Sequence, residues 1–541
     1  MRRLISISLW VLALLVGTCF TACTFHEDME MSMSQHEEGA YLKLQVRVPN
    51  DNVTRANPTG GANGDGTEAG IESSNRHENK LNNVMVFIIR AYNGLDASGT
   101  TTFLFKGYLN SLSEGWSEQS YGVDVTFPTG DYVPQDGDRV IVVANAGDKT
   151  NLITTLGALR DWTTYSAWSG SSVSEAHDFV MSSADNSGTQ GKVVVGTHTG
   201  RKEDPYISEL DIQRAAARID FMYNDTHNRP GSIPYTELLY KVTKNPDDKT
   251  SDVLGTVHLQ NIIPVNLMQE SSGFIKRVTE NDNIKSSIKY AAAETPTSGK
   301  PTNYVIEPHT LDKENKRVED LDTELGTWYG NTRASQVFAS PNSCLGDANS
   351  IATYMATKTE KSEMSYFTHY MTLAYTNENT QSKEKHDPNF MTGLLLKATY
   401  VPTTVYSDAS LTVASYTKGT TFWRYTPTKA SMVEEDSKYF TTEGAATAYK
   451  AAHPEDLAEI VEYPSGICYY NLWLRHANVE ANPHETFPME YGIVRNNIYR
   501  VGVDKFTGPG TPTPTFEGPT RVHLRIFVRP WNKRVHPEIL L

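Results

Sequence analysis

Two segments near opposite ends of the chain carry an aliphatic residue at every second position, with mainly polar or basic residues between them. The aliphatic residues are Leu42, Leu44, Val46 and Val48 in the first segment and Val522, Leu524, Ile526 and Val528 in the second. Because successive side chains of a strand point to opposite faces, each segment predicts a half-buried β-strand. Pro49 and Pro530 follow these residues, and proline belongs at a strand end or a sheet edge because it has no N–H to donate. The pattern therefore favours a sheet-rich fold.

The two alternating segments present the same pattern, so either could fill the same groove of a β-sandwich. The alternative, two unrelated amphipathic strands, stays open on pattern alone. Burying four aliphatic side chains is worth roughly 6–12 kcal/mol, at about 1.5–3 kcal/mol each. An open groove would therefore be a strong site for strand addition.

A loop rich in glycine and asparagine, residues 50–78, follows the first segment and contains Arg55-Ala56. While this loop is intact, the first strand has a large effective-concentration advantage over any incoming strand. A cut between Arg55 and Ala56 by a trypsin-like protease would abolish that advantage. The pattern thus predicts a polymerisation switch that proteolysis triggers.

The N-terminus predicts export. Arg2 and Arg3 precede a short apolar run, residues 4–16, and small residues follow, as in a secretory signal peptide. The run ends in FTAC, residues 20–23, which resembles a bacterial lipobox in which Cys23 is lipidated and becomes the first mature residue. Phe20 departs from the usual leucine, and the alternative is ordinary cleavage nearby that removes Cys23 or leaves it as a spare thiol. In either case residues 1–22 are excluded from the fold.

The composition and the missing motifs exclude several classes of protein. Lys and Arg total 49 against 64 Asp and Glu, a net charge of −15, which argues against a nucleic-acid-binding protein. The chain carries no zinc-protease, serine-hydrolase, P-loop or dinucleotide-binding motif, so we expect no enzyme and neither a metal nor a cofactor. Beyond the signal, no segment approaches the roughly 20 continuous apolar residues of a transmembrane helix.

Cys344 and Cys468 remain once the signal region is set aside. In an oxidising compartment these two residues could form a disulfide. Two buried free thiols fit the sequence equally well, because the sequence cannot give the Cα distance that decides the matter. Their spacing is not that of a zinc site or a redox pair.

The sequence divides near a polar stretch with several Pro and Thr residues, and we place a domain boundary within residues 265–300. The expected parts are a signal peptide (1–22), a propeptide with the removable strand (23–55), two domains (56–280 and 281–520) and a C-terminal segment (521–541). Further strands are predicted at 84–89, 101–108, 123–127, 139–147, 366–374, 394–401 and 521–530. Helices are predicted within 151–168 and over 443–461.

The C-terminal half contains two long motifs, YPSGICYYNLWLRHAN at residues 463–478 and FPMEYGIVRNNIYRV at residues 487–501. These motifs resemble the Mfa-type fimbrillins, the major subunits of minor fimbriae in Bacteroidota. The N-terminal half resembles the first domain of the same superfamily in its lipobox and in four shorter motifs. They are VTRA (53–56), VMVFII (84–89), VVANA (142–146) and RAAARI (214–219).

The resemblance implies a mostly β chain of two transthyretin-like β-sandwich domains with a few short helices. It also implies an outer-membrane lipoprotein precursor, Arg-specific proteolysis after the first strand, and polymerisation by donor-strand exchange into a type V pilus shaft. Carried over by position, Cys23 is the lipid (palmitate) site, Arg55-Ala56 the processing site and 521–541 the donor segment. The donor face is either residues 522–528 or the last residues with Val535, Ile539 and Leu541, and the sequence leaves both open.

The function that we expect is that of a surface fimbrial shaft subunit that supports adhesion and biofilm formation. Its expected partners are further copies of itself, anchor and tip subunits, an Arg-specific protease and, for the precursor, outer-membrane lipid. The sequence does not identify an adhesive ligand. The alternative is a monomeric surface lipoprotein, or a pilus anchor or tip subunit, that binds a glycan or a host protein. The presence of both the Arg-Ala loop and an alternating C-terminal strand favours the shaft.

Overall fold

A computed structural model describes most of the chain outside the N-terminus, the centre and the C-terminal end. The described residues are 39–48, 72–73, 76–90, 100–110, 112, 116–117, 122–164, 167–170, 177–183, 191–222, 238–245, 251–265, 267, 271–274, 370–379, 391–428, 434–475, 491–514 and 521–532. The fold is mostly β, as predicted. Within these ranges the α-helices are α2 (Leu156–Asp161) and α7 (Glu443–Ala452).

The N-terminal sandwich is built on one sheet with the strand order β4-β3-β7-β9-β11-β1-β6-β5 and with β10 beside β11. The strands are β1 (Tyr41–Arg47), β3 (Val84–Ile89), β4 (Phe105–Leu109), β5 (Trp116–Ser117), β6 (Gly122–Pro128), β7 (Arg139–Ala144), β9 (Met181–Ser183), β10 (Val193–Val194) and β11 (Tyr206–Arg214). Strand β11 joins the two halves of this sheet, β4-β3-β7-β9 and β1-β6-β5. Its first part pairs with β1 and its last residues pair with β9. Every residue of β3 is buried, as expected for a continuous apolar strand. The two halves enclose one hydrophobic core, which α2 joins through Leu156 and Leu159.

The C-terminal sandwich consists of two sheets, β16-β12-β24-β25-β2 and β13-β14-β17-β23. Their bounds are β2 (Glu72–Ser73), β12 (Ala216–Met222), β13 (Leu238–Thr243), β14 (Val253–Val265), β16 (Tyr370–Asn377), β17 (Gly393–Pro402), β23 (Ile467–Trp473), β24 (Asn497–Phe506) and β25 (Val522–Asn532). The ring of Phe506 in the first sheet lies 5.1 Å from Tyr240 and 4.6 Å from Tyr470 in the second sheet. The two sheets therefore pack face to face over a second core. A small separate pair joins β8 (Thr163–Thr164) to β15 (Ser271–Ser272).

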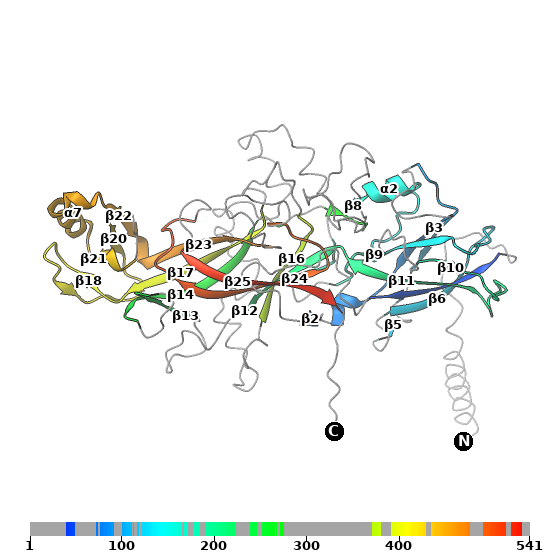
Figure 1. The fold of residues 1–541 in the computed structure, drawn as a ribbon, viewed down its shortest axis with the longest axis horizontal. Coiled ribbons are helices and arrows are strands. Elements are labelled where there is room, and N and C mark those ends of the chain that lie inside the picture. Colours follow the sequence, from blue (N-terminus) through cyan, green and yellow to red (C-terminus); the bar gives the residue numbers. More distant parts are fainter. Residues whose placement is uncertain are drawn as a thin grey trace, which may run out of the picture.

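A third unit, residues 403–466, is inserted between β17 and β23 and forms one end of the molecule (Figure 1). Its sheet has the order β19-β18-β21-β20-β22. The strands are β18 (Val405–Tyr406), β19 (Val413–Ala414), β20 (Phe422–Thr426), β21 (Lys438–Phe440) and β22 (Glu459–Tyr463). Among the described residues, the 3-10 helices of this unit are η8 (Glu434–Asp436), η9 (Pro454–Asp456) and η10 (Pro464–Gly466), and η1 (Arg76–Asn79) lies near β2 in the sequence. Helix α7 covers this sheet, because its Ala445 and Ala446 share a small core with Tyr425 and Phe440.

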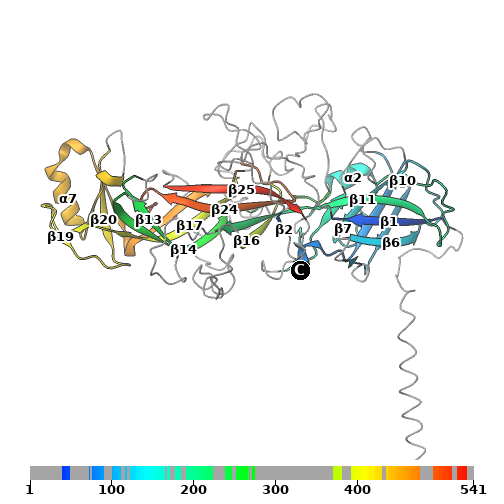
Figure 2. The same ribbon diagram turned by 60° about the horizontal axis from the view of Figure 1, so that its bottom comes forward.

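The two sandwiches are joined by a nearly continuous strand. Strand β11 ends at Arg214 and β12 begins at Ala216; Ala216 belongs to the N-terminal core and Ala217 to the C-terminal core. Tyr375 and Ile498, on strands of the C-terminal sandwich, also pack into the N-terminal core. The sandwiches and the inserted unit follow one another along an elongated molecule (Figures 1 and 2). The domain boundary expected within residues 265–300 needs correction, because β12, β13 and β14 precede it and already belong to the sheets of the C-terminal sandwich.

Most of the predicted elements that fall on described residues are confirmed, with two corrections. The helix predicted over 443–461 ends at Ala452, and the last part of that range forms β22. Pro454 explains the early end, because its ring and missing N–H are incompatible with a helix interior. The strand predicted at 101–108 begins only at Phe105. The helix predicted within 151–168 is α2, where Thr155 Oγ1 accepts a hydrogen bond from Ala158 N at 3.1 Å as an N-cap.

Candidate functional site: the slot of the first strand

The first alternating segment is a central strand of the N-terminal sheet. Strand β1 runs parallel to β11 and antiparallel to β6, so it has a backbone hydrogen-bond ladder on both sides (Figure 2). In the β11 register Leu42 pairs with Tyr206, and in the β6 register it pairs with Phe127. Removing β1 would therefore leave two unpaired strand edges facing each other across a slot one strand wide.

The inward face of β1 is fully buried. Leu42, Leu44 and Val46 are 0% exposed and Val48 is 2% exposed, and all four belong to the N-terminal core. The alternation predicted from the sequence is thus confirmed residue by residue. A strand of the same alternating pattern is what this slot requires, because each aliphatic residue contributes about 1.5–3 kcal/mol on burial.

On the β6 side, the outward face of β1 contacts one carboxylate, Asp124, and on the β11 side Glu209 and Asp211 stand in register with Gln45 and Arg47. Gln45 lies directly opposite Asp124 and donates to its Oδ2 at 3.0 Å. Lys43 Nζ lies 3.3 Å from Oδ2 and Arg47 Nη2 lies 2.5 Å from Oδ1. Partial burial raises the pKa of Asp124, but the hydrogen bonds from Gln45 and Arg47 outweigh it, so the pKa lies below its ordinary value.

The two ends of the slot are fitted to the backbone of β1. At its beginning Tyr41 N donates to Gly200 O at 2.8 Å, and Thr129 N donates to Ala40 O at 2.7 Å. At its end Gly122 stands opposite Arg47, and a Cβ on Gly122 would lie 2.1 Å from Val46 O. Arg47 Nη1 also donates to Val46 O and Val123 O at 3.1 and 3.2 Å. The slot thus fixes where its strand begins and ends.

The second alternating segment is paired within its own sandwich. Strand β25 runs antiparallel to β24 along its length, from Val522 opposite Phe506 to Pro530 opposite Asn497. On its other side it pairs only with β2, where Glu72 faces Trp531 and Ser73 faces Asn532. The backbone of Leu524, Ile526 and Val528 therefore lies in a strand with one long ladder, whereas β1 has two. Val522 is 4% exposed and belongs to the C-terminal core.

The predicted processing residues lie outside the described residues. Cys23, Arg55 and Ala56 fall there, as do Val535, Ile539 and Leu541. The described chain leaves β1 at Val48 and resumes at β2, so the chain between them connects the slot to the edge of the C-terminal sandwich. Their roles stay predictions.

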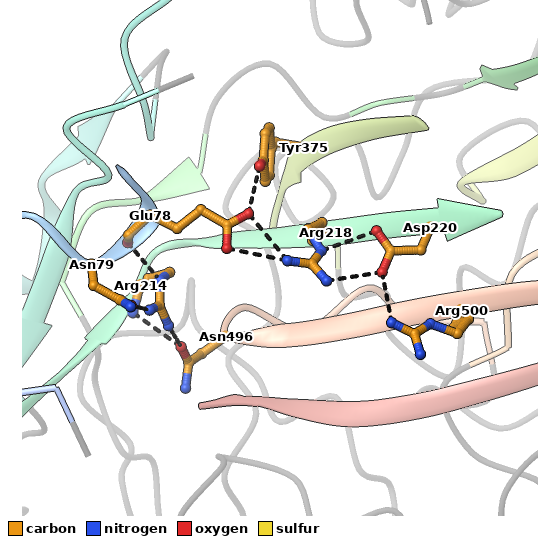
Figure 3. A network of polar contacts seen from close by, with 8 residues as sticks. All are labelled: Glu78, Asn79, Arg214, Arg218, Asp220, Tyr375, Asn496 and Arg500. Carbon is orange, nitrogen blue, oxygen red and sulfur yellow. Dashed lines mark hydrogen bonds and ion pairs between the residues drawn. The ribbon is translucent and has the colours of Figure 1, made fainter. Parts of the chain in front are cut away.

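A buried polar network lies where the two sandwiches meet (Figure 3). Arg218 on β12 binds both oxygens of Glu78 at 3.2 and 3.1 Å, and its other nitrogens bind the two oxygens of Asp220 at 3.0 Å each. Tyr375 on β16 donates to Glu78 Oε1 at 2.5 Å, and Arg500 on β24 lies 3.4 Å from Asp220 Oδ2. Burial, and next the charge of Glu78, raise the pKa of Tyr375. Tyr375 therefore keeps its proton and donates a hydrogen bond to Glu78.

The same network ties η1 to the strand that joins the sandwiches. Arg214, at the end of β11, donates through Nε to the backbone oxygen of Glu78 at 3.0 Å. Its other nitrogens bind the side-chain oxygens of Asn79 and Asn496, the latter at 3.1 Å. Burial lowers the pKa of Arg214 to about 10, which still leaves it charged at neutral pH. The last residues of the predicted processing loop, residues 50–78, thus lie in η1 and are anchored at the junction.

Sequence reasoning missed both Asp124 and the junction network. The motif RAAARI contained a usable signal, because two arginines in an apolar strand pattern must find buried partners. Nothing local to Glu78 points to it, since it meets Arg218 across 140 residues. Asp124 alternates with buried Val123 and Val125, which places it on the outward face but does not reveal its partners.

Cys468 is buried and bonded to no cysteine among the described residues, and its thiol donates to Tyr470 Oη at 3.5 Å. Burial raises the pKa of this thiol to about 11, so it is un-ionised at neutral pH. Cys344 lies outside the described residues, and its pairing with Cys468 stays a prediction. Within the described ranges, no group of three or more His, Cys, Asp or Glu residues could hold a metal ion. In the same ranges no helix has the length and apolar character needed to cross a membrane.

Residues 461–536 match the family model described as major fimbrial subunit protein type IV, fimbrillin, C-terminal. The matched segment contains β23, β24 and β25 and both long motifs of the C-terminal half. The resemblance to the fimbrillins is confirmed. The fimbrillin match thus includes the second alternating strand. No curated protein matches the chain at a significant level.

Several solved structures of fimbrillins and adhesion proteins are similar to this chain over nearly its whole length. A fimbrilin (fimA) from Porphyromonas gingivalis W83 is 12% identical, with 92% of this chain and 99% of that chain covered and a TM-score of 0.37. A putative cell adhesion protein from Bacteroides eggerthii is also 12% identical, with 92% and 97% covered and a TM-score of 0.37. The tip fimbrial protein Mfa3 from P. gingivalis is 10% identical, with 91% and 99% covered and a TM-score of 0.33.

Proposed function

We propose that this chain is a shaft subunit of a surface fimbria that is made as an outer-membrane lipoprotein precursor and polymerises by strand exchange. In this proposal Cys23 carries the lipid, an Arg-specific protease cuts between Arg55 and Ala56, and β1 leaves with the propeptide. A strand from the C-terminal segment of another copy then fills the slot. The fimbrillin match over residues 461–536 supports the fimbrial role.

The observation that carries the proposal is the environment of β1. It is a central strand with a fully buried inward face, yet it is the first described strand and is joined to the rest of the chain only through the segment with Arg55. A cut in that segment turns β1 into a separate peptide held by non-covalent contacts alone. Its effective-concentration advantage over a strand from another copy is then lost.

The pairing of β25 supplies a driving force for its transfer. In its own sandwich β25 has one long ladder and a two-residue contact with β2, whereas the β1 slot offers ladders on both sides. A strand that moves from the edge into the slot exchanges one ladder for two. Residues 522–528 are therefore our first choice of donor, and the residues after Asn532 are the second.

Arg55→Ala tests this function in the chain of residues 24–541. We expect the unmodified chain to give a ladder of multimers on an unboiled denaturing gel after Arg-specific proteolysis, with Ala56 as the new N-terminus. The Arg55→Ala variant should stay uncut at this position and monomeric. Arg201→Ala, which removes an exposed arginine on a described turn, is the matched control and should assemble normally.

The other outcomes separate the alternatives. Normal multimers from Arg55→Ala would exclude the proteolytic switch. A monomer that stays monomeric after the cut would instead favour an anchor or tip subunit, or a surface lipoprotein that binds a glycan or a host protein. Deleting residues 533–541 distinguishes the two donors, because only the second choice predicts a loss of assembly.

A further inference from the structure

The inward face of the β1 slot specifies its strand poorly. Aliphatic residues repeat every second position, so a strand that slips by two residues still places aliphatic side chains in most of the buried positions. On the β6 side, the outward face does not repeat in this way, whereas on the β11 side Glu209 and Asp211 stand two residues apart. Asp124 is the one ionisable residue of β6, and Lys43, Gln45 and Arg47 of β1 all contact it.

The chain offers two sequences with which to compare β1. When Val522, Leu524, Ile526 and Val528 take the places of Leu42, Leu44, Val46 and Val48, Arg525 takes the place of Gln45. Arg525 then stands opposite Asp124, and Phe527 stands opposite Gly122, where no side chain competes for space. When residues 535–541 are placed in the same way, Pro537 takes the place of Leu44 and Glu538 stands opposite Asp124.

These two arrangements differ sharply in energy. Opposite charges directly across a strand pair are stabilising, whereas like charges there are destabilising. Glu538 opposite Asp124 is a like-charge pair, and Pro537 would lack an N–H in a strand that has a ladder on both sides. Arg525 keeps the charge complementarity that β1 itself has with Asp124. Slipping residues 522–528 by two positions replaces Arg525 with His523 or Phe527.

We propose that Asp124 sets the register of the strand in this slot and selects residues 522–528, with Arg525 facing it, over the C-terminal nine residues. This inference rests on the proposed strand exchange and names the residue that distinguishes one incoming strand from another. Asp124 thus has two successive partners, the outward face of the chain's own β1 before processing and the outward face of another copy's C-terminal strand afterwards.

A four-variant cycle tests the pairing in the chain of residues 24–541, cut after Arg55. The variants are the unmodified chain, Asp124→Lys, Arg525→Glu and the double variant, and the measurement is the rate of multimer formation. We expect Arg525→Glu to slow assembly about fivefold in the unmodified background and to speed it about fivefold in the Asp124→Lys background. The reversal of sign is decisive, because a simple folding defect of β25 would slow assembly in both backgrounds.

Two controls separate an effect on the binding of the incoming strand from an effect on the release of β1. Release of the cut β1 fragment is measured for each variant, because Asp124→Lys also removes the contacts to Lys43 and Arg47. Asp136→Lys, an exposed residue on a neighbouring turn, makes the same charge change away from the slot and should leave the cycle unchanged. Glu538→Lys should not alter assembly in either background.

A disulfide trap tests the register without changing either charge. With His523 at the place of Lys43, His523→Cys in one copy should cross-link to Thr126→Cys in another, because Lys43 pairs with Thr126. Paired residues on adjacent strands lie within disulfide range. A two-residue slip would instead cross-link His523→Cys to Pro128→Cys, the partner of Tyr41.

The outcomes distinguish a failure of the role of Asp124 from a failure of the strand-exchange function. Multimers that form with no sign reversal, or with the Pro128 cross-link, would overturn the role of Asp124 and leave the strand-exchange function standing. Dependence on Glu538 in place of Arg525 would assign the donor to the last nine residues. The absence of multimers from the unmodified chain would overturn the strand-exchange function itself and this inference with it.

Discussion

The β1 slot and the junction network are both buried, but they hold their partners by different physics. The slot is apolar inside, repeats every two residues and has its carboxylates, Asp124 among them, on its outward rim. The network contains charges that are 0% exposed and that bind one another through specific pairs, such as Arg218 with Glu78 and Asp220. The apolar inside of the slot accepts any strand with the right alternation and leaves the choice among such strands to its rim, whereas a buried charge accepts only a partner of the right charge at the right place. The slot is thus suited to exchange and the network to permanent attachment.

The largest effect that we expect is from Arg218→Ala. Removing this guanidinium leaves Glu78 and Asp220 buried without their main partner, and breaking a buried ion pair costs about 3–5 kcal/mol. Urea unfolding of the uncut chain should show the loss. Lys244→Ala removes an exposed ion pair with Glu435 and should cause no measurable change. Equal effects of the two substitutions would mean that the junction is not a permanent joint.

Leu44→Ala should come next, and its effect should depend on the state of the chain. In the uncut chain the loss of this buried side chain should cost about 2–5 kcal/mol of stability. In multimers from which β1 has left, the same substitution should have no effect on stability. Val194→Ala, on an exposed position of the same sheet, is the control for the uncut chain. A stability loss that persists in the multimers would show that β1 stays in its slot.

Gly122→Ala should have an intermediate effect. Its Cβ would lie 2.1 Å from the backbone oxygen of Val46 and 2.7 Å from Cδ of Arg47, so the end of β1 must shift. We expect a cost of about 1–3 kcal/mol in thermal unfolding and faster release of β1 after the cut. Gly444→Ala has no atom within 4 Å of the new Cβ and lies in helix α7, so it should stabilise the chain slightly. A fast-releasing β1 without a loss of stability would contradict the close fit.

The smallest effect that we expect is the pH dependence of β1 retention. Because the folded pKa of Asp124 lies below its ordinary value, its contribution is present at neutral pH and is lost as the pH falls from that ordinary value through the folded pKa. The cut β1 fragment should therefore leave faster in acid than at neutral pH, as measured by gel filtration of the cut chain. Asp124→Asn should reduce this acceleration. An unchanged acceleration in Asp124→Asn would assign it to other carboxylates.

The sequence determined the local features of this protein. Period-two alternation predicted β1 and its buried face, the apolar run at 84–89 predicted β3, and the composition predicted a mostly β fold. These predictions succeed because successive side chains of a strand point to opposite faces, so the position of a residue in the alternation determines its face. The helix predicted over 443–461 shows the limit, since the part after Ala452 contains Pro454 and pairs with β20 as β22.

Only the tertiary structure decided which of the two similar strands has two ladders and which has one. Strands β1 and β25 have the same sequence pattern, but their environments are set by neighbours far away in the chain, which are β11 and β6 for β1 and β24 for β25. The same is true of Asp124, which meets Gln45 across 79 residues, and of Glu78, which meets Tyr375 across 297. A local sequence pattern predicts the face of the strand that a residue occupies, whereas the identity of its partner depends on how distant strands are ordered in the sheet.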